Sequence, residues 1–551
     1  MAWFGLSRRR WRSLTQFVGL LSLCMALIVS CTSPDSTTDE GTEPDTGAES
    51  ATESVGGRIT MGTTQEVRTL DPADSYEIFP GILLYNMGDR LYSYTPGTTD
   101  LVPQLATEMP TLSDDGRVYT IPLREGVTFH DGSDFNAEVM AFSIQRFMEN
   151  GGRPSYLLGD KIESVEATGD YELTITLNEP FAAFTALLTF WGVTPVPPEQ
   201  YEMAESSFQP DTFIGTGPYK LSELTPETVR LEVFEDYWGE APANEGFDIQ
   251  LFSSPANLYN AFRTGDLDIA YQTLDPEQIT SLEEEASEGG WDVIEAGTTV
   301  INYMLLNQTI EPLDNPTVRQ AIAALVDRPL LNERVFQGQA DPLYSLIPTS
   351  FDIYEPVFEE EYGDGNAELA KELLAEAGYD ESNPLVLEIW YPSSSTQRNL
   401  VATTMEASFE EQLPGIVDVE VKDVESATAW PNIDEGIYPT FLLNWYPDFY
   451  DADTFIQPFM ECLNGSGNTC NESANKSFYY SEKANELISK QRAETDPEVR
   501  KEYFVELQTM LGEDVPYIPL WQNKDYIFVQ EGVENASIEP TQQFLLWQVS
   551  R

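Results

Sequence analysis

Short strand patterns alternate with amphipathic helix patterns from residue 58 to residue 551. Such alternation is typical of an α/β fold, in which helices cover the faces of a sheet. The stretch is too long for one hydrophobic core, because single cores stop growing at about 250–300 residues. The sequence therefore predicts an α/β protein with two or three lobes.

Local signals place several of these elements. Apolar and polar residues alternate at 117–123 and at 172–177, which predicts two strands. Asn136 is a predicted helix cap, and Asn315, followed by a proline, is another. A third helix is expected to run to Gly378, because glycine commonly ends helices. We interpret the apolar stripes of these helices as structural core.

The N-terminal residues 1–30 read as an export signal. Four arginines precede an apolar run at 17–29, which is shorter than the roughly 20 residues that a membrane span needs. The run leads to Ser30 and Cys31, an order that resembles the lipobox of bacterial lipoproteins and predicts lipidation of Cys31. The alternative is an ordinary signal peptide with an incidental cysteine. Residues 31–57 lack aromatic and basic side chains, which predicts a flexible acidic tether.

The charge balance is strongly acidic. The chain has 93 Asp and Glu against 29 Lys and Arg, a formal net charge of -64. This balance argues against nucleic-acid binding, which needs a basic surface. Two interpretations remain: a solubilising surface suited to a saline medium, which the sequence favours, and an acidic site for cationic cargo.

Cysteine and histidine counts restrict the chemistry. After the signal and Cys31, only Cys462 and Cys470 remain, and in an oxidising compartment they are expected to form a disulfide. A redox or metal pair is the alternative. His130 is the only histidine, which excludes zinc sites built from several histidines. We predict no metal and no cofactor, and any hydrolase would have to rely on carboxylates alone.

Several sequence blocks resemble the family 5 extracellular solute-binding proteins of ABC importers, the group that binds oligopeptides, dipeptides and nickel. The signature blocks lie at residues 105–107, 113–116 and 123–132. Further blocks follow in the expected order at residues 215–219, 313–321, 375–379, 445–455 and 515–520. The resemblance extends over essentially all of residues 58–551.

The resemblance implies a two-lobed periplasmic-binding-protein type II fold, with mixed sheets flanked by helices and an extra subdomain in lobe I. Two crossing strands would lie near 300–307 and near 520–529. The implied boundaries are 58–94, 95–213 and 214–304 for lobe I, with 95–213 as its inserted subdomain, then 305–523 for lobe II and 524–551 for the return to lobe I. His130 lies in a signature block and is interpreted as scaffold.

The resemblance also implies a ligand site. In peptide-binding members, a Trp-x-x-Asp motif places its aspartate against the free α-amino group of the peptide, and Trp445 and Asp448 match that spacing. A buried ammonium group is costly unless a carboxylate meets it. The aromatic residues Tyr446 and Phe449 are predicted apolar walls, although each could equally belong to the core. Asp448 could alternatively cap a turn.

Two further residues complete the predicted ligand-binding set. Asn444 begins the same aromatic segment, and Arg398 lies near the place where dipeptide-binding members carry an arginine for the peptide carboxylate. If no arginine faces that carboxylate, longer peptides become more probable ligands than dipeptides.

The predicted function is therefore capture of short peptides by closure of the lobes, followed by delivery to the permease of an ABC transporter. We expect a monomer, held at the membrane of the periplasm or cell surface through lipidated Cys31, with no enzymatic activity. The alternatives are an oligosaccharide or metal chelate as ligand, or a secreted carboxylate-dependent hydrolase, which would need two acids facing each other across a cleft.

Overall fold

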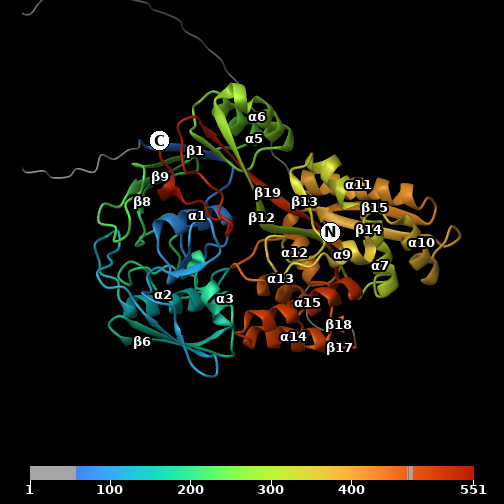
Figure 1. The fold of residues 1–551 in the computed structure, drawn as a ribbon, viewed down its shortest axis with the longest axis horizontal. Coiled ribbons are helices and arrows are strands. Elements are labelled where there is room, and N and C mark those ends of the chain that lie inside the picture. Colours follow the sequence, from blue (N-terminus) through green and yellow to red (C-terminus); the bar gives the residue numbers. More distant parts are fainter. Residues whose placement is uncertain (1–56, 468, 471–475) are drawn as a thin grey trace, which may run out of the picture. The chain divides into compact units, whose positions relative to one another are not determined.

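Two long antiparallel strands pair with each other near one edge of the main sheet (Figure 1). The computed structural model describes residues 57–467, 469–470 and 476–551, which belong to one compact unit. The two strands are β12 (Trp291–Leu306) and β19 (Tyr517–Gln530), and they pair along most of their length. Both are longer than the crossing segments predicted near 300–307 and 520–529. β19 contains all of the second segment, and β12 contains the first except for residue 307.

These strands belong to a nine-stranded sheet of mixed direction. Its order is β16-β12-β19-β11-β1-β10-β9-β8, with β13 paired to β19, and β1 is parallel to both of its neighbours. The other members are β1 (Ile59–Thr63), β8 (Tyr219–Leu224), β9 (Thr228–Val233), β10 (Gly246–Leu251), β11 (Ile269–Tyr271), β13 (Ala340–Pro342) and β16 (Thr440–Trp445). The predicted α/β fold with mixed sheets flanked by helices is therefore confirmed.

Buried side chains gather into two large cores that share the long strands. The N-terminal core consists mainly of residues between Ile59 and Tyr271, and Ile527 and Val529 of β19 add to it. The C-terminal core lies between Ile301 and Trp521. The end of β12 and the start of β19 thus pack in the C-terminal core, whereas Trp291 at the start of β12 belongs to a third, smaller cluster. The expected lobe boundaries stay predictions.

The N-terminal core carries a smaller four-stranded sheet in the order β4-β5-β7-β6. The strands are β4 (Thr111–Leu112), β5 (Val118–Pro122), β6 (Ile162–Gly169) and β7 (Glu172–Leu177), with a separate pair β2 (Tyr92–Tyr94) and β3 (Leu101–Pro103). The helices in this part of the chain are α1 (Ile78–Met87), α2 (Ala137–Glu149), α3 (Tyr156–Gly159), α4 (Phe184–Leu187), α5 (Pro255–Arg263) and α6 (Pro276–Gly289). Both predicted strands are present, and the Asn136 side chain accepts a hydrogen bond at the start of α2 as expected.

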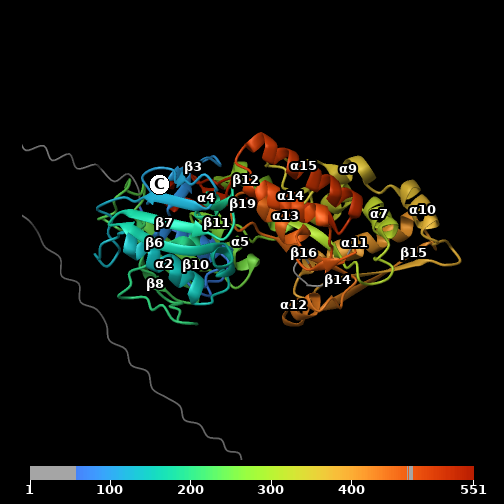
Figure 2. The same ribbon diagram turned by 90° about the horizontal axis from the view of Figure 1, so that it is seen from below.

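The C-terminal core is predominantly helical, around a parallel pair of β14 (Leu385–Pro392) and β15 (Val417–Val424). Its helices are α7 (Pro316–Leu325), α8 (Arg328–Leu331), α9 (Val357–Tyr362), α10 (Ala367–Glu376), α11 (Thr396–Gln412), α12 (Ser426–Asp434), α13 (Asp453–Met460), α14 (Glu482–Ala493) and α15 (Pro497–Asp514). Figure 2 shows α13, α14 and α15 packed together. Asn315 caps α7 as predicted, and α10 ends two residues before Gly378.

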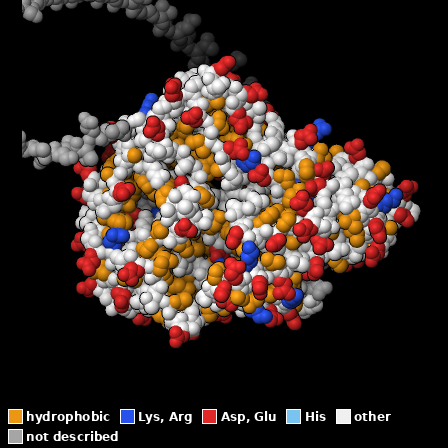
Figure 3. Space-filling model, in the orientation of Figure 1, with side chains coloured by type: hydrophobic (Ala, Val, Ile, Leu, Met, Phe, Trp, Pro, Cys, Tyr) orange, Lys and Arg blue, Asp and Glu red, His pale blue; other side chains and the backbone are white. Residues whose placement is uncertain are grey.

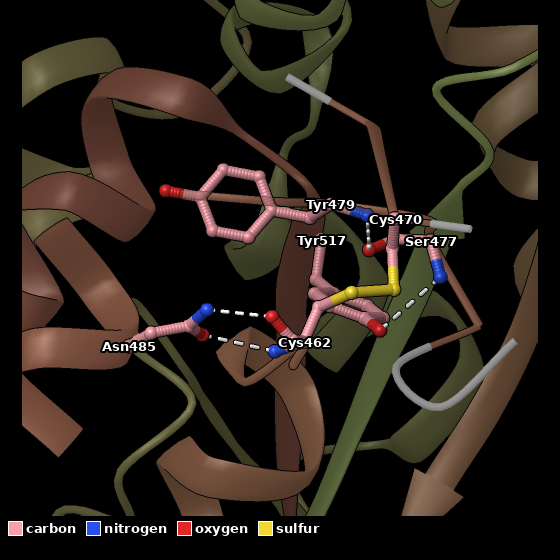
Figure 4. Close-up of a disulfide and its surroundings, with 6 residues drawn as sticks. All are labelled: Cys462, Cys470, Ser477, Tyr479, Asn485 and Tyr517. Atoms are coloured by element: carbon pink, nitrogen blue, oxygen red, sulfur yellow. Dashed lines mark hydrogen bonds between the residues drawn. A yellow bond between two sulfur atoms is a disulfide. The ribbon is translucent and has the colours of Figure 1, made fainter. Parts of the chain in front are cut away.

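A disulfide joins Cys462 to Cys470, next to the short hairpin β17 (Gly465–Ser466) and β18 (Thr469–Cys470). Figure 4 shows the Asn485 side chain hydrogen-bonded to the backbone of Cys462. The backbone N–H of Cys462 donates a hydrogen bond of 3.0 Å to Asn485 Oδ1. The structure therefore contains the pairing that the cysteine count predicted.

The described surface reflects the composition. Figure 3 shows acidic side chains scattered over the face that it draws, with few basic ones among them. Every helix within the described residues falls short of the length and hydrophobicity that a membrane span requires. The predicted signal, the lipidation site Cys31 and all of the tether except its last residue lie outside the described residues.

Candidate ligand-binding site

A cavity of about 660 Å³ lies between side chains of both cores, a size that is typical of small-molecule sites. Its lining comes from segments far apart in the sequence: the start of α1, the ends of β11 and β16, and the middle of β12 and β19. The lining residues are Gln65, Tyr76, Glu77, Ile78, Trp191, Gln272, Thr273, Val300, Trp430, Asn444, Trp445, Tyr446, Pro447, Asp448, Asn523, Asp525 and Gln542.

The predicted segment reaches this cavity because β16 ends there. Asn444 and Trp445 still pair with β12, and the chain then leaves the sheet and presents Tyr446 and Asp448 to the cavity. The Trp445 ring packs edge-on against Phe459, with 5.6 Å between ring centroids. Its Nε1 is buried without a hydrogen-bond partner in the described structure. Tyr446 is 43% exposed, so its ring is available to a ligand.

The Asp448 carboxylate has neutral partners only. Tyr76 donates a hydrogen bond of 2.6 Å to its Oδ1. Tyr76 has a single hydroxyl proton, so Tyr156 must be the donor in the 2.6 Å bond between the two tyrosines. Burial raises the pKa of Asp448 to about 6, although the hydrogen bond from Tyr76 and the charge of Lys161 both act to lower it. Asp448 is thus a half-buried acid without an ion-pair partner among the described residues.

A second carboxylate, Asp525 on β19, also lines the cavity. Gln272 donates a hydrogen bond of 2.7 Å to its Oδ2, and Gln65 in turn donates one of 2.9 Å to Gln272. Burial raises the pKa of Asp525 to about 7.

The third acid, Glu77, differs because it is already paired. Arg68 and Arg153 both contact it at 2.6 Å. Burial alone would raise the pKa of Glu77, but the hydrogen bond and charge of Arg68 outweigh it and the pKa is lowered. Neither arginine is among the residues that line the cavity, and the described lining contains no lysine or arginine at all. The cavity is therefore acidic.

Two residues of the predicted set lie outside the described lining. Phe449 is 8% exposed and packs in the N-terminal core, with 6.0 Å between its ring centroid and that of Phe181. Phe449 also lines a smaller cavity next to Asp448, so its predicted role as an apolar wall of the ligand site stays a prediction. Arg398 lies behind the lining, where its guanidinium donates a hydrogen bond to the Asn444 side chain. Arg398 is not among the residues that line this cavity, and its predicted role as the partner of a peptide carboxylate stays a prediction.

His130 is built into the scaffold, as interpreted from its sequence. Its Nδ1 accepts a hydrogen bond from the Gly215 backbone at 3.2 Å, and its Nε2 donates to the Gly217 carbonyl at 3.1 Å. Burial lowers the pKa of His130 to about 4, so the ring is neutral at physiological pH. In the described residues, no group of three or more His, Cys, Asp or Glu side chains is arranged to hold a metal ion.

Most of the lining could not be predicted from single motifs. A sequence pattern could have indicated Asp525, because the polar run 522–525 interrupts a strand that is otherwise apolar. Tyr76, Gln272 and Trp430 have no comparable signal, since each stands in an ordinary loop or helix sequence.

Comparison with known proteins agrees with this architecture. Residues 100–467 match the family described as bacterial extracellular solute-binding proteins, family 5 middle. The chain belongs to this family.

The family 5 assignment makes the protein a non-enzymatic, extracytoplasmic solute-binding component of an ABC transporter. Among curated relatives, the glutathione-binding protein GsiB of Escherichia coli K12 is 25% identical over 481 residues, which cover 84% of this chain and 88% of GsiB. The GsiB of Shigella flexneri serotype 5b is 25% identical over 483 residues, with the same coverage of both chains.

Solved structures share the fold. DppA from Helicobacter pylori in complex with the peptide STSA has a TM-score of 0.74 at 23% identity, covering 90% of this chain and 99% of DppA. OppA from Haemophilus influenzae in complex with RPPGFSPFR has a TM-score of 0.71 at 22% identity, covering 90% and 98%. NikA from Brucella suis in complex with Fe(III)-EDTA has a TM-score of 0.76 at 20% identity, covering 89% and 99%.

Proposed function

We propose that this family 5 protein captures short peptides in the cavity, with Asp448 binding the peptide's α-ammonium group, and delivers them to the permease of an ABC importer. The proposal depends on the surroundings of the Asp448 carboxylate. This carboxylate lines the cavity, holds one hydrogen bond from a neutral tyrosine and has no cationic partner among the described residues. A ligand ammonium would supply the charge that this acid lacks.

The energetics favour such a pairing. Burial has already raised the pKa of Asp448, so part of the cost of desolvating the carboxylate is present before the ligand arrives. Removing one partner from a buried ion pair costs roughly 3–5 kcal/mol, because the other charge is left buried alone. A peptide terminus fixed in this way is held in register without any side chain being read.

The cavity charge bears on which ligand is bound. Three acids and no basic side chain line its described wall, so a ligand carboxylate would be repelled there. Free glutathione, the ligand named for the GsiB relatives, carries two carboxylates for one ammonium at neutral pH. The charge therefore favours peptides whose carboxylate end lies outside the cavity.

Lobe closure and membrane anchoring would both assist capture. Closure of two lobes around the ligand would remove water from the Asp448 contact and strengthen it. A lipid on Cys31 and an acidic tether would keep the protein near its permease and raise its effective concentration there.

The test combines ligand identification with one isosteric variant. Mass spectrometry of material released from purified protein should find peptides with free amino termini. By calorimetry, Asp448→Asn should weaken the binding of such a peptide by about 10²–10³-fold. The matched control is Asp418→Asn, which removes one exposed carboxylate from β15, outside the cavity, and should bind as the wild type does. Equal affinity for the Asp448 variant and the wild type would refute the anchor.

A further inference from the structure

Asp525 is an acid that the proposed amine anchor does not use. It lies on β19 opposite Ala296 of β12, where the two long strands pass the cavity. Asp448 comes from a different element, the loop after β16. The cavity therefore presents two carboxylates from two separate segments of the chain.

The side-chain contacts of Asp525 hold it in place without neutralising it. Its Oδ2 accepts the hydrogen bond from Gln272, which Gln65 orients in turn. Its Oδ1 has no hydrogen-bond or ion-pair partner among the described residues, and Asp525 is one of the residues that line the cavity. Two neutral amide side chains thus hold one carboxylate oxygen and leave the other without a partner in the described structure.

The basic residue next to Asp525 in sequence, Lys524, pairs with other acids. Lys524 points to the other side of the strand, where its Nζ contacts Glu295 at 2.8 Å and Asp341 at 3.7 Å. Burial acts alone on the pKa of Asp525, since no described cation contributes to its shift. A half-buried carboxylate of this kind is costly to keep unless a ligand uses it.

We propose that Asp525 binds a second cationic group of the ligand, so that the protein prefers peptides that carry a lysine or arginine side chain near the amino terminus. This inference rests on the proposed function, because it takes Asp448 to hold the α-ammonium group. The open Oδ1 accepts a hydrogen bond from the ligand's side-chain ammonium or guanidinium group, while Oδ2 stays bound to Gln272.

A basic side chain fits this position better than the other cations that a carboxylate can attract. A divalent metal ion takes several oxygen ligands at once, and in the described residues no group of three or more His, Cys, Asp or Glu side chains is arranged to hold one. The exposed rings of Tyr446 and Trp430, which also line the cavity, can cover the methylene groups of a long basic side chain. Tyr446 is close enough to Asp525 for the two to interact electrostatically.

The test uses tetrapeptides of alanine with a free amino terminus, each carrying one lysine at position 1, 2 or 3, and matched peptides with norleucine at the same position. Norleucine keeps the side-chain length and removes the ammonium group. Calorimetry at physiological salt, where charges on the distant surface are screened beyond about 8 Å, gives the ratio of the two affinities. We expect the wild type to prefer lysine at one position by about tenfold or more, the range of one charge-assisted hydrogen bond.

Three variants distinguish the two carboxylates. Asp525→Asn can keep the hydrogen bond from Gln272 and should bring the lysine-to-norleucine ratio close to one. Asp448→Asn should lower the affinity for both the lysine and the norleucine peptide and leave the ratio of the two affinities unchanged. Asp418→Asn, the exposed control, should leave the affinities and their ratio as in the wild type.

Each outcome decides a separate claim. No preference for lysine at any position in the wild type, or a preference that survives in Asp525→Asn, would overturn the second cation site while leaving the amine anchor intact. If no tetrapeptide binds to the wild type, both claims fall together. Binding of free spermidine that is stronger than that of every lysine peptide would also overturn the inference, because the cavity would then select polyamines.

Discussion

Replacing Asp525 by asparagine should make the ligand-free protein more stable, and the gain should grow with pH. Burial raises the pKa of Asp525 from 3.8 to about 7 in the folded protein. A group with a raised folded pKa adds stability at low pH, and that stability is lost as the pH rises through the folded value. Asparagine does not titrate, so the stability of the variant does not fall as the pH rises through that pKa.

The size of the effect follows from the shift. Between pH 5 and pH 7 the folded protein keeps a proton on Asp525 that the unfolded chain has released, and each pH unit is worth about 1.4 kcal/mol. The upper limit is therefore about 3 kcal/mol between pH 5 and pH 8. Asp525 is half-buried, and water that reaches it screens part of this cost, so we expect about 1–3 kcal/mol.

The assay is chemical denaturation of ligand-free protein at pH 5 and pH 8, comparing Asp525→Asn with wild type at each pH. Many carboxylates titrate in this range, but the difference between the two proteins isolates Asp525. Its titratable neighbours Tyr271 and Tyr446 both have a pKa raised above the ordinary tyrosine value of 10.0, so they stay neutral. Asp418→Asn, which removes an exposed carboxylate from β15, is the control for the loss of one negative charge. A stability difference between Asp525→Asn and wild type that does not change with pH would refute the predicted effect of Asp525.

Three further results are expected. The affinity for a peptide with a free amino terminus should fall as the pH drops from 8 to 5, because the pKa values of about 6 for Asp448 and about 7 for Asp525 mean that both acids become protonated; calorimetry showing constant affinity would contradict this. Phe449→Ala should lower the free energy of unfolding by about 3–5 kcal/mol in denaturant titrations, whereas a loss below 1 kcal/mol would mean that the ring is not core. With a formal charge of -64, the melting temperature should rise between low and molar salt, and a flat or falling profile would argue against a screened acidic surface.

The fold was largely predictable because its signals are local. The cap at Asn136, the alternation in β5 and β7, and the Asn-Pro start of α7 are each set by a few neighbouring residues, and the structure has all of them. The lengths of β12 and β19 were less predictable. Their central and outer parts pair with each other across more than two hundred residues of sequence, and such pairing leaves no local pattern.

The residues of the site likewise differ in whether local sequence could identify them. Asn444, Trp445, Tyr446 and Asp448 form one continuous segment, so one motif could identify them, and all four line the cavity. Phe449 follows directly in sequence but packs in the N-terminal core, where its ring contacts Phe181, a residue far away along the chain. The same holds for the remaining lining residues, whose proximity to the segment exists only in the folded chain.

The two carboxylates show why an acidic composition alone did not reveal the site. Most acids of this chain can be solvated or paired, as Glu77 is with Arg68 and Arg153, and they reveal nothing about cargo. Asp448 and Asp525 differ because burial raises their pKa while their recorded hydrogen-bond partners are neutral. Keeping them unpaired lowers the stability of the empty protein and leaves an attraction that only a cation can satisfy. A cation that binds there offsets this loss of stability, so the two unpaired carboxylates favour a positively charged ligand over a neutral one.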